Sequence, residues 1–403
     1  MFNKLQTAFA KHFPECAPSV LASAPGRVEL AGNHTDHQGG LVISGAIDLR
    51  CWGLAGLNGT NQIRLAMDGF GEAVLDLDEP NALEPRESER GTSLALVRGM
   101  AAELVRAGGA LRGFSMTTCS DIPAGCGVSS SAAFEMLVGS VIQALCADEG
   151  EGAWPGPIDL ALAGMHAERA YFGKPCGAQD QIASACGNAV AMDFSSNPPH
   201  VQRLGFDADA CSHALCLIDS QADHSLYTDE FAAIPEEMQQ VARLFGHEAL
   251  GAVSPADFLM GIDRVRTQLS DRHALRALHF FAETNRVALQ REALESGNFG
   301  AFLEHVRLSG ASSAQFLQNV SPEANRTAPG GQPAMVILAL CAQLLGTRGA
   351  WRIHGGGFGG SVLAFVPQEE ATQFVCSMNA CLGYNACRLL NISSQGAWAQ
   401  RID

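Results

Sequence analysis

The sequence predicts a two-domain α+β protein, and three observations lead to this prediction. The chain has 403 residues, which is more than one hydrophobic core usually serves. Segments with strand and helix patterns alternate irregularly in two blocks, as in α+β proteins. Between the blocks, the stretch SSNPPH at 195–200 interrupts the pattern with two prolines and polar residues. We therefore expect an N-terminal domain at 1–200 and a C-terminal domain at 201–403.

The first block is predicted to be rich in strands. Apolar patterning indicates strands at 20–30, 41–57, 61–67, 72–78 and 114–123. Helices are expected at 93–107, 131–147 and 158–172. In the first of these helices, four apolar residues recur at helical spacing before a pair of glycines: Leu94, Val97, Ala101 and Leu104.

The second block is predicted to be richer in helices. The stretch HALCLID at 213–219 is typical of a strand, and long helical patterns follow at 274–295, 298–309 and 333–346. The end of the chain alternates a strand at 361–366, a helix at 369–381 and a strand at 387–393. No internal repeat or low-complexity tract interrupts these segments.

Composition excludes several classes of partner. Apolar residues make up 47% of the chain and charged residues 17%, which is typical of a compact protein rather than a disordered one. The formal net charge is −16, from 42 acidic and 26 basic residues. Because this excess repels phosphate backbones and anionic lipids, we expect neither a nucleic-acid nor a membrane partner.

The sequence also predicts a cytoplasmic location. The start, MFNKLQTAFAKHFPECAPSV, lacks the apolar core of a secretory signal, and nowhere do 18 apolar residues follow one another. The 13 cysteines are scattered without a C-x-x-C pair, so we expect reduced thiols rather than disulfides or structural zinc. We expect a monomer or a weak homo-oligomer.

The stretch GNHTDHQGG at 32–40 crowds polar side chains between glycines. His34 and His37 flank Asp36 closely enough to suggest metal ligands. The same residue types also suit a polar turn. A transition-metal site would need a third convergent ligand, and the sequence offers none nearby, so the stretch alone leaves both interpretations open.

The stretch DIPAGCGVSSSAAFE at 121–135 predicts a phosphate-binding loop. Gly125 and Gly127 allow backbone N–H groups to approach a ligand closely. Ser129, Ser130 and Ser131 lead into a helix whose free N–H groups favour an anion, best a nucleotide's phosphates. The alternative is a helix start of small residues packed tightly on a sheet.

A second glycine-rich stretch, HGGGFGGSVLAF at 354–365, favours the phosphate-binding interpretation. Five glycines around one phenylalanine cost conformational entropy unless the backbone must approach something closely. Two such loops in different domains predict a cleft between the domains. Neither a Walker A motif nor a dinucleotide fingerprint is present.

Three stretches resemble, in order, the motifs of the GHMP small-molecule kinases: APGRVELAGNHTDHQGG (24–40), IPAGCGVSSSAAFE (122–135) and GGGFGGS (355–361). The first also resembles the galactokinase signature, and the likeness extends across nearly the whole chain. The resemblance implies an N-terminal domain with a mixed sheet, a C-terminal α+β domain, and an active site in the cleft between them.

The resemblance implies two catalytic residues. The stretch GKPCGAQDQ at 173–181 resembles the galactokinase segment that carries the catalytic aspartate, which corresponds to Asp180. Its carboxylate would accept a hydrogen bond from the anomeric C1 hydroxyl, and the extent of proton transfer stays open. Arg27 corresponds to the arginine that stabilises the transferred phosphoryl group and keeps Asp180 ionised. Alone, Asp180 would suit a loop cap and Arg27 a surface ion pair.

The resemblance implies ATP and Mg²⁺ as cofactors. The implied nucleotide contacts lie in the phosphate-binding loop, at Gly125, Gly127, Ser129, Ser130, Ser131 and Ala132. Ser131 and Glu168 correspond to positions that help hold Mg²⁺, an ion that favours few protein oxygens beside phosphates and waters. Alone, Glu168 would suit a solvated helix face.

The implied sugar-binding residues are Asn33, His34, Asp36, Gly177 and Phe231. Asp36 would accept hydrogen bonds from ring hydroxyls and His34 would exchange others, which favours a sugar-binding loop over a transition-metal site. Galactokinases usually have glutamate in place of Asn33 and tyrosine in place of His37 and Phe231. An amide removes the charge of that glutamate and adds two donors, so a C6 carboxylate could be accepted there. Plant galacturonokinases share DHQGG and lack the glutamate.

We therefore expect ATP-dependent phosphorylation of the C1 hydroxyl of galactose or a close analogue, giving a sugar 1-phosphate and ADP. The nearest alternative is galacturonokinase activity. A second alternative is a non-catalytic sugar sensor on the same scaffold, although Ala132 and Ala133 are present where such paralogues lose small residues. Other branches of the superfamily, such as mevalonate or homoserine kinases, are disfavoured by HTDHQGG and CGAQDQ.

Overall fold

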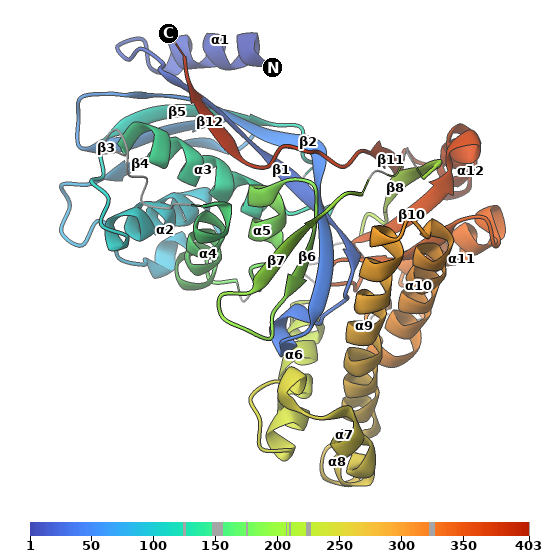
Figure 1. The fold of residues 1–403 in the computed structure, drawn as a ribbon. Helices are drawn as coiled ribbons and strands as arrows, with labels where there is room; N and C mark the ends of the chain where they lie inside the picture. Colours follow the sequence, from blue (N-terminus) through green and yellow to red (C-terminus); the bar gives the residue numbers. More distant parts are fainter. Residues whose placement is uncertain are drawn as a thin grey trace.

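The computed structural model builds two β-sheets, each covered by helices (Figure 1). It describes residues 1–403 except for 124, 125, 147–155, 175, 207, 209, 210, 223–226, 322–326 and 403. Within the described residues, one sheet has eight strands and the other has four. This combination of helices and sheets confirms the predicted α+β class.

The first sheet is mixed, as the resemblance implied. Its strands are β1 (Val20–Ala31), β2 (Leu41–Leu57), β3 (Gln62–Met67), β4 (Gly71–Asp76), β5 (Phe114–Ser120), β6 (Ala189–Asp193), β7 (His200–Leu204) and β12 (Trp398–Arg401). They follow the order β12-β1-β2-β5-β3-β4, with β6 paired to β2 and β7 paired to β6. β3 and β5 are parallel, whereas β1 and β2 are antiparallel.

β2 is the long central strand of this sheet (Figure 1). Its first part pairs with β6 and its second part with β5, while β1 lies along most of its length. Val42, Ile43, Ala46 and Ile47 are all fully buried. An apolar run that is buried on both faces is typical of a central strand, which explains why 41–57 was recognisable from sequence.

Helices cover both faces of the first sheet. They are α1 (Phe2–His12), α2 (Ser93–Arg106), α3 (Ser130–Cys146), α4 (Pro157–Ala167), a π-helical turn (Glu168–Phe172) and α5 (Gln179–Cys186). On one face Leu137 of α3 packs against Gly53 of β2. On the other face Leu5 and Phe9 of α1 pack around Leu54. Burial on both sides fixes the sheet and the loops at its ends.

The second sheet is entirely antiparallel, in the order β11-β8-β10-β9. Its strands are β8 (His213–Asp219), β9 (Ala350–His354), β10 (Ser361–Pro367) and β11 (Cys387–Leu390). The helices are α6 (Thr228–Leu244), α7 (Pro255–Met260), α8 (Ile262–Gln268), α9 (Asp271–Glu295), α10 (Phe299–Ser312), α11 (Pro333–Leu345) and α12 (Ala371–Leu382). α9 packs on α10 and also contacts β2, so it joins the two sheets.

Most predicted elements are present, and the differences have physical reasons. The helix expected at 158–172 widens into π-helical geometry from Glu168. Several elements were not predicted: α1, α5, α6, α7, α8, β6, β7, β9 and β12. Apart from the longer α6, these segments are short and carry too few apolar repeats to show a period. α5 matters most, since its first turn carries Asp180.

The end of the chain returns to the first sheet, where β12 pairs with β1. Arg50 of β2 holds this return segment. Its guanidinium, on a residue only 7% exposed, donates to the Gln395 carbonyl at 2.9 Å and the Gly396 carbonyl at 2.7 Å. The proposed division at residue 200 therefore separates most elements of the two sheets, but β12 and β7 cross it.

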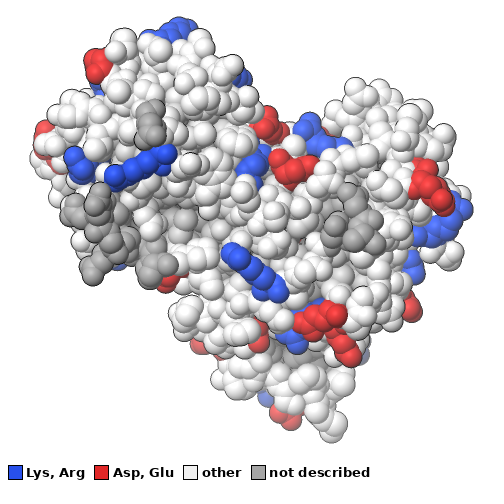
Figure 2. All heavy atoms as spheres, turned by 45° about the horizontal axis from the view of Figure 1, so that its top comes forward, with Lys and Arg blue, Asp and Glu red and all other residues white. Residues whose placement is uncertain are grey.

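Charges are mixed on the face drawn in Figure 2, where Lys and Arg side chains lie among Asp and Glu side chains. Outside the grey residues, that face carries no broad basic patch of the kind that binds nucleic-acid backbones. Among the helices that the structure describes, none is long and apolar enough to cross a membrane.

Replacing Arg50 by methionine should lower the free energy of unfolding by about 2–4 kcal/mol, because buried carbonyls then lose a charged donor. Urea titration followed by circular dichroism measures this change. Arg64→Met is the matched control in another strand of the same sheet, since Arg64 makes one exposed ion pair with Glu15 and should cost less than about 1 kcal/mol. Equal losses for both variants would contradict the role given to Arg50.

Candidate active site

Arg27 and Asp180 meet at the centre of the candidate site. Arg27 lies on β1, and its Nε donates to Asp180 Oδ1 at 2.6 Å. Its Nη1 donates to the Gly127 carbonyl, also at 2.6 Å. The Ser129 hydroxyl donates to the other carboxylate oxygen of Asp180. Four residues from three separate stretches of the sequence thus form one constellation.

Asp180 is held in its ionised form. Burial acts to raise the pKa of its carboxyl group, but the charges of Arg27 and Lys174 and the hydrogen bonds from Arg27 and Ser129 outweigh burial. The net effect lowers the pKa below its ordinary value. At neutral pH the carboxylate is therefore a hydrogen-bond acceptor and a weak base.

The phosphate-binding loop lies directly beside this pair. Gly127 and Ser129 both have left-handed backbones, with φ of 72° and 56°, and α3 begins at Ser130. Ser130 is exposed, whereas Ala132 is buried beneath it. The loop therefore presents the start of α3 to the outside. Gly125 lies outside the described residues.

The glycine-rich loop at 355–360 reaches the phosphate-binding loop from the second sheet. Ser361, which follows it, donates through its hydroxyl to the Cys126 carbonyl at 2.7 Å. The backbone N–H of Arg27 donates to the Val128 carbonyl at 3.1 Å. The two loops and β1 are thus hydrogen-bonded together around the start of α3.

Ser131 and Glu168 are brought together as the resemblance implied. The Ser131 hydroxyl donates to Glu168 Oε1 at 2.9 Å, and Lys174 Nζ lies 3.1 Å from the same oxygen. The other oxygen of Glu168 accepts from the Gln181 amide at 2.7 Å. Neighbouring hydroxyl and carboxylate oxygens suit Mg²⁺, so these residues fit a sparse magnesium site completed by phosphates and water. Among the described residues, no group of three or more His, Cys, Asp or Glu side chains is arranged to hold a metal ion by itself.

The stretch 32–40 and the glycine-rich loop form a second wall. His34 has a left-handed backbone with φ of 59°, and its Nε2 lies 3.0 Å from the Gly356 carbonyl oxygen. The ring of Phe231, on α6, lies 5.5 Å from the His34 ring and packs so closely on Gly356 that a Cβ there would clash. His34, Gly356 and Phe231 therefore gather at one place.

Asp36 lies against Gly177, which precedes α5. A Cβ on Gly177 would clash with the Asp36 carboxylate, so only glycine permits this approach. The pKa of Asp36 is raised, first by burial, and the negative charge of Asp180 adds to the effect. Asp36 therefore belongs to the same electrostatic environment as the Arg27–Asp180 pair.

The two histidines of this loop are neutral. His34 Nδ1 lies 3.2 Å from His37 Nε2. Burial, and for His34 also the neighbouring His37, lowers the pKa of His34 to about 3 and that of His37 to about 4. Their contacts with each other and with a backbone carbonyl favour a hydrogen-bonding surface over a metal centre.

Asn33 is fully buried, and its side chain contacts only protein groups. Its amide nitrogen donates to Glu29 Oε1 at 3.1 Å and to the Gly355 carbonyl at 2.6 Å. Its amide oxygen accepts from Asn319 at 2.8 Å and from Ser313 at 3.2 Å. Direct contact of Asn33 with a sugar stays a prediction, and it would require at least one of these bonds to break.

A charged layer surrounds Asn33. Arg352, which is fully buried, donates to Glu29 Oε1 at 2.5 Å, and Arg286 pairs with the buried Glu283. The backbone N–H of Asn33 donates to Glu283 at 3.4 Å. Each of these two arginines therefore has a glutamate partner close to Asn33.

Comparison with known proteins identifies two family models and several structures that match the chain. Residues 7–57 match the family model described as the galactokinase galactose-binding signature, and residues 95–188 match the GHMP kinases N terminal domain. The galactokinase of Lactococcus lactis, solved with galactose, has 24% sequence identity and a TM-score of 0.81, over 98% of this chain and 99% of that one. The chain is galactokinase-like and has the GHMP kinase fold.

Other GHMP-type structures match less closely. A D-glycero-D-manno-heptose 1-phosphate kinase from Bacteroides thetaiotaomicron has 17% identity and a TM-score of 0.62, over 95% of this chain and 99% of that one. The mevalonate kinase of Methanococcus jannaschii has 15% identity and the same TM-score, over 95% and 98% of the two chains. These matches show that the chain shares its fold with kinases that act on different small molecules.

Three residues of the candidate site were not predicted from sequence. Glu29 and Arg352 form its buried ion pair, and His354 lies between the two loops. A charged residue in an apolar strand, as at Glu29 in VELA, was the available signal. It did not identify a partner, because Arg352 is more than three hundred positions away.

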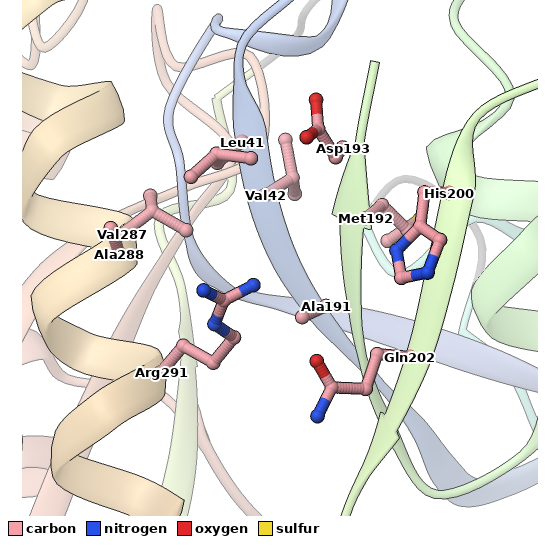
Figure 3. A pocket seen from close by; sticks show the side chains of 10 residues that line it. All are labelled: Leu41, Val42, Ala191, Met192, Asp193, His200, Gln202, Val287, Ala288 and Arg291. Atoms are coloured by element: carbon pink, nitrogen blue, oxygen red, sulfur yellow. The ribbon is translucent and has the colours of Figure 1, made fainter. Parts of the chain in front are cut away.

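The pocket in Figure 3 is separate from these residues. It is a small hollow of about 10 Å³ between α9 and strands β2, β6 and β7, and none of the predicted site residues is among its ten lining residues. Polar side chains line it beside apolar ones such as Val42 and Val287: Asp193, His200, Gln202 and Arg291. The Arg27–Asp180 constellation, rather than this pocket, is therefore the candidate site.

Stability should decrease as the pH falls from about 6.5 to about 4. His34 and His37 have pKa values lowered in the folded state, so the unfolded chain binds protons first as the solution is acidified. Each histidine should cost about 2 kcal/mol at pH 5 relative to pH 8. Urea titrations across this range measure the slope, and His37→Asn should make it shallower. His247→Asn, at an exposed position, is the control. If both variants change the slope of stability against pH equally, the pH dependence does not come from the buried histidines.

Proposed function

We propose that the protein transfers the γ-phosphoryl group of ATP to the anomeric C1 hydroxyl of galactose or a close neutral analogue. The observation that carries the proposal is the contact of Arg27 with both Asp180 and the Gly127 carbonyl. This arginine links an ionised carboxylate to the loop before a helix N-terminus. Such a constellation holds a nucleophile and an anionic phosphoryl group side by side.

Asp180 would orient the attacking hydroxyl. Because its carboxylate is ionised, it accepts a hydrogen bond from the C1 hydroxyl and receives the proton as the new bond to phosphorus forms. The bond between phosphorus and the oxygen of ADP breaks in the same displacement. Ser129 donates to Asp180 and so fixes the direction of the carboxylate.

Arg27 and the phosphate-binding loop would stabilise the phosphoryl group. The guanidinium supplies a positive charge, and the start of α3 supplies backbone N–H groups. Mg²⁺, when bound, neutralises phosphate charge. Ser131 and Glu168 would hold it, with Gln181 orienting the Glu168 carboxylate.

The sugar would lie between His34, Asp36 and Phe231. Asp36 offers acceptors for hydroxyl hydrogens, and the neutral imidazoles of His34 and His37 can each donate or accept. Gly177 keeps space for Asp36, and the face of Phe231 offers an apolar surface. This lining is suited to a neutral, hydroxyl-rich ligand.

The same lining disfavours galacturonate. A C6 carboxylate would need a cation or free donors, and Asn33 already donates both amide protons to Glu29 and Gly355. Arg352 is paired with Glu29. We therefore propose that Asn33 acts indirectly, by holding the glycine-rich loop against the sugar-binding loop.

The substrate is tested with purified protein, ATP and Mg²⁺ on galactose, N-acetylgalactosamine and galacturonate, measuring ADP release. We expect kcat/KM to be highest for galactose. A clear preference for galacturonate would refute the neutral-sugar proposal. Sugar binding without ATP turnover on any of these sugars would instead support a sensor.

Asp180→Asn should lower kcat by about 10²–10⁴-fold while sugar affinity changes little, because the isosteric amide cannot accept the proton. Steady-state kinetics and equilibrium titration with galactose measure the two quantities. Asp193→Asn is the matched control on β6 and should retain wild-type kcat. Undiminished turnover by Asp180→Asn would exclude the mechanism.

Asn33→Ala should destabilise the protein by about 2–4 kcal/mol, because it leaves several buried groups without partners. The ratio of kcat/KM for galactose to that for galacturonate should change by less than about threefold. Thermal unfolding and the sugar panel measure both. A stable variant with altered preference would show instead that Asn33 contacts the sugar.

A further inference from the structure

His354 is the last residue of β9 and stands directly before the glycine-rich loop. It is only 3% exposed. Its Nε2 lies 3.0 Å from the backbone nitrogen of Glu29. Because that N–H is a donor, Nε2 must act as the acceptor and carry no hydrogen. In the neutral ring the hydrogen is therefore on Nδ1.

This Nδ1–H has no hydrogen-bond partner among the residues that the structure describes. Nδ1 lies beside the phosphate-binding loop, because a Cβ built on Gly127 would be 3.7 Å from it. Apart from the residues that adjoin Gly127 in the chain, no other described atom lies within 4 Å of that Cβ position. Buried polar groups rarely stay unpaired, so a bound ligand is the natural acceptor.

The surroundings indicate what kind of ligand this is. Gly127 is exposed, and its carbonyl accepts from Arg27, which also binds Asp180. The free donor thus lies next to the arginine and the loop that precedes α3, where an anion is favoured. The residues proposed to hold the sugar, His34 and Phe231, contact Gly356 instead.

The ring stays neutral in this position. Burial lowers the pKa of His354 well below its usual range, and the positive charges of Arg27 and Arg352 add to this effect. The imidazole therefore remains a fixed donor at Nδ1 and does not exchange protons during turnover.

We propose that the Nδ1–H of His354 donates a hydrogen bond to an oxygen of the phosphoryl group that ATP transfers. His354 would be a further catalytic residue, and the inference rests on the proposed function. It forms no covalent bond and moves no proton. A neutral donor placed in advance stabilises charge on the phosphoryl oxygens, in addition to the charge of Arg27.

Two replacements separate this role from a merely structural one. In His354→Gln, the amide oxygen takes the place of Nε2 and still accepts from Glu29, while the Nδ1 donor is lost. In His354→Asn, the amide nitrogen takes the place of Nδ1 and the acceptor for Glu29 is lost. The two variants therefore test the two ring nitrogens independently.

We expect His354→Gln to lower kcat by about tenfold to a hundredfold, with an unchanged melting temperature and unchanged KM for galactose. His354→Asn should melt at a lower temperature but retain more of the wild-type kcat, measured where it is folded. The reverse order, with activity following stability and Gln close to wild type, would overturn the proposal.

Nucleotide binding tests the contact without sugar turnover. By calorimetry with Mg²⁺, His354→Gln should bind the non-hydrolysable ATP analogue AMP-PNP about threefold to tenfold more weakly than wild type, and ADP equally well. Equal affinities for AMP-PNP, or the same loss for both nucleotides, would overturn the proposal. If wild type phosphorylates none of the sugars, the proposed function fails, but this comparison still decides whether His354 contacts the terminal phosphate.

Discussion

The site depends on one buried amide. The side chain of Asn33 fills all four of its hydrogen-bonding positions with protein groups, from β1, the glycine-rich loop, the π-helical turn after α10 and the segment that follows it. Its carbonyl and N–H engage His279 and Glu283 of α9. In a buried position such a saturated amide fixes the geometry of everything bound to it, because any shift leaves a polar group unpaired. The stretch 32–40 and the glycine-rich loop are therefore held at a set distance.

This arrangement gives a physical reason for asparagine, rather than glutamate, at position 33. A carboxylate there would lie beside Glu29 and Glu283, both buried and each already paired with an arginine. A third buried negative charge would be costly without a further cation. The amide is thus the residue that suits these neighbours. The carboxylate that Asn33 contacts is that of Glu29, on β1.

Sequence patterns predicted the parts of the fold that depend on local regularity. β1 and β2 are apolar runs, and α9 has a long helical period, so their residues alone indicate their structure. Family resemblance located the loops around Arg27 and Asp180. What neither could supply is contact between distant positions. The return of β12 to β1, the pairing of Glu29 with Arg352, and the direction of His354 all depend on side chains packed from far along the chain.

The left-handed residues in the loops have a consequence for how this protein can change. His34, Ser129 and Phe358, one in each motif loop, hold conformations that a glycine would adopt more easily. Each costs stability in return for a side chain at that point. A glycine at any of these positions would remove the backbone strain, but it would also remove the side chain. A substitution that stabilises these loops in this way therefore cannot keep the side chains that they present. In all three loops the sequence keeps the side chain and accepts the backbone strain.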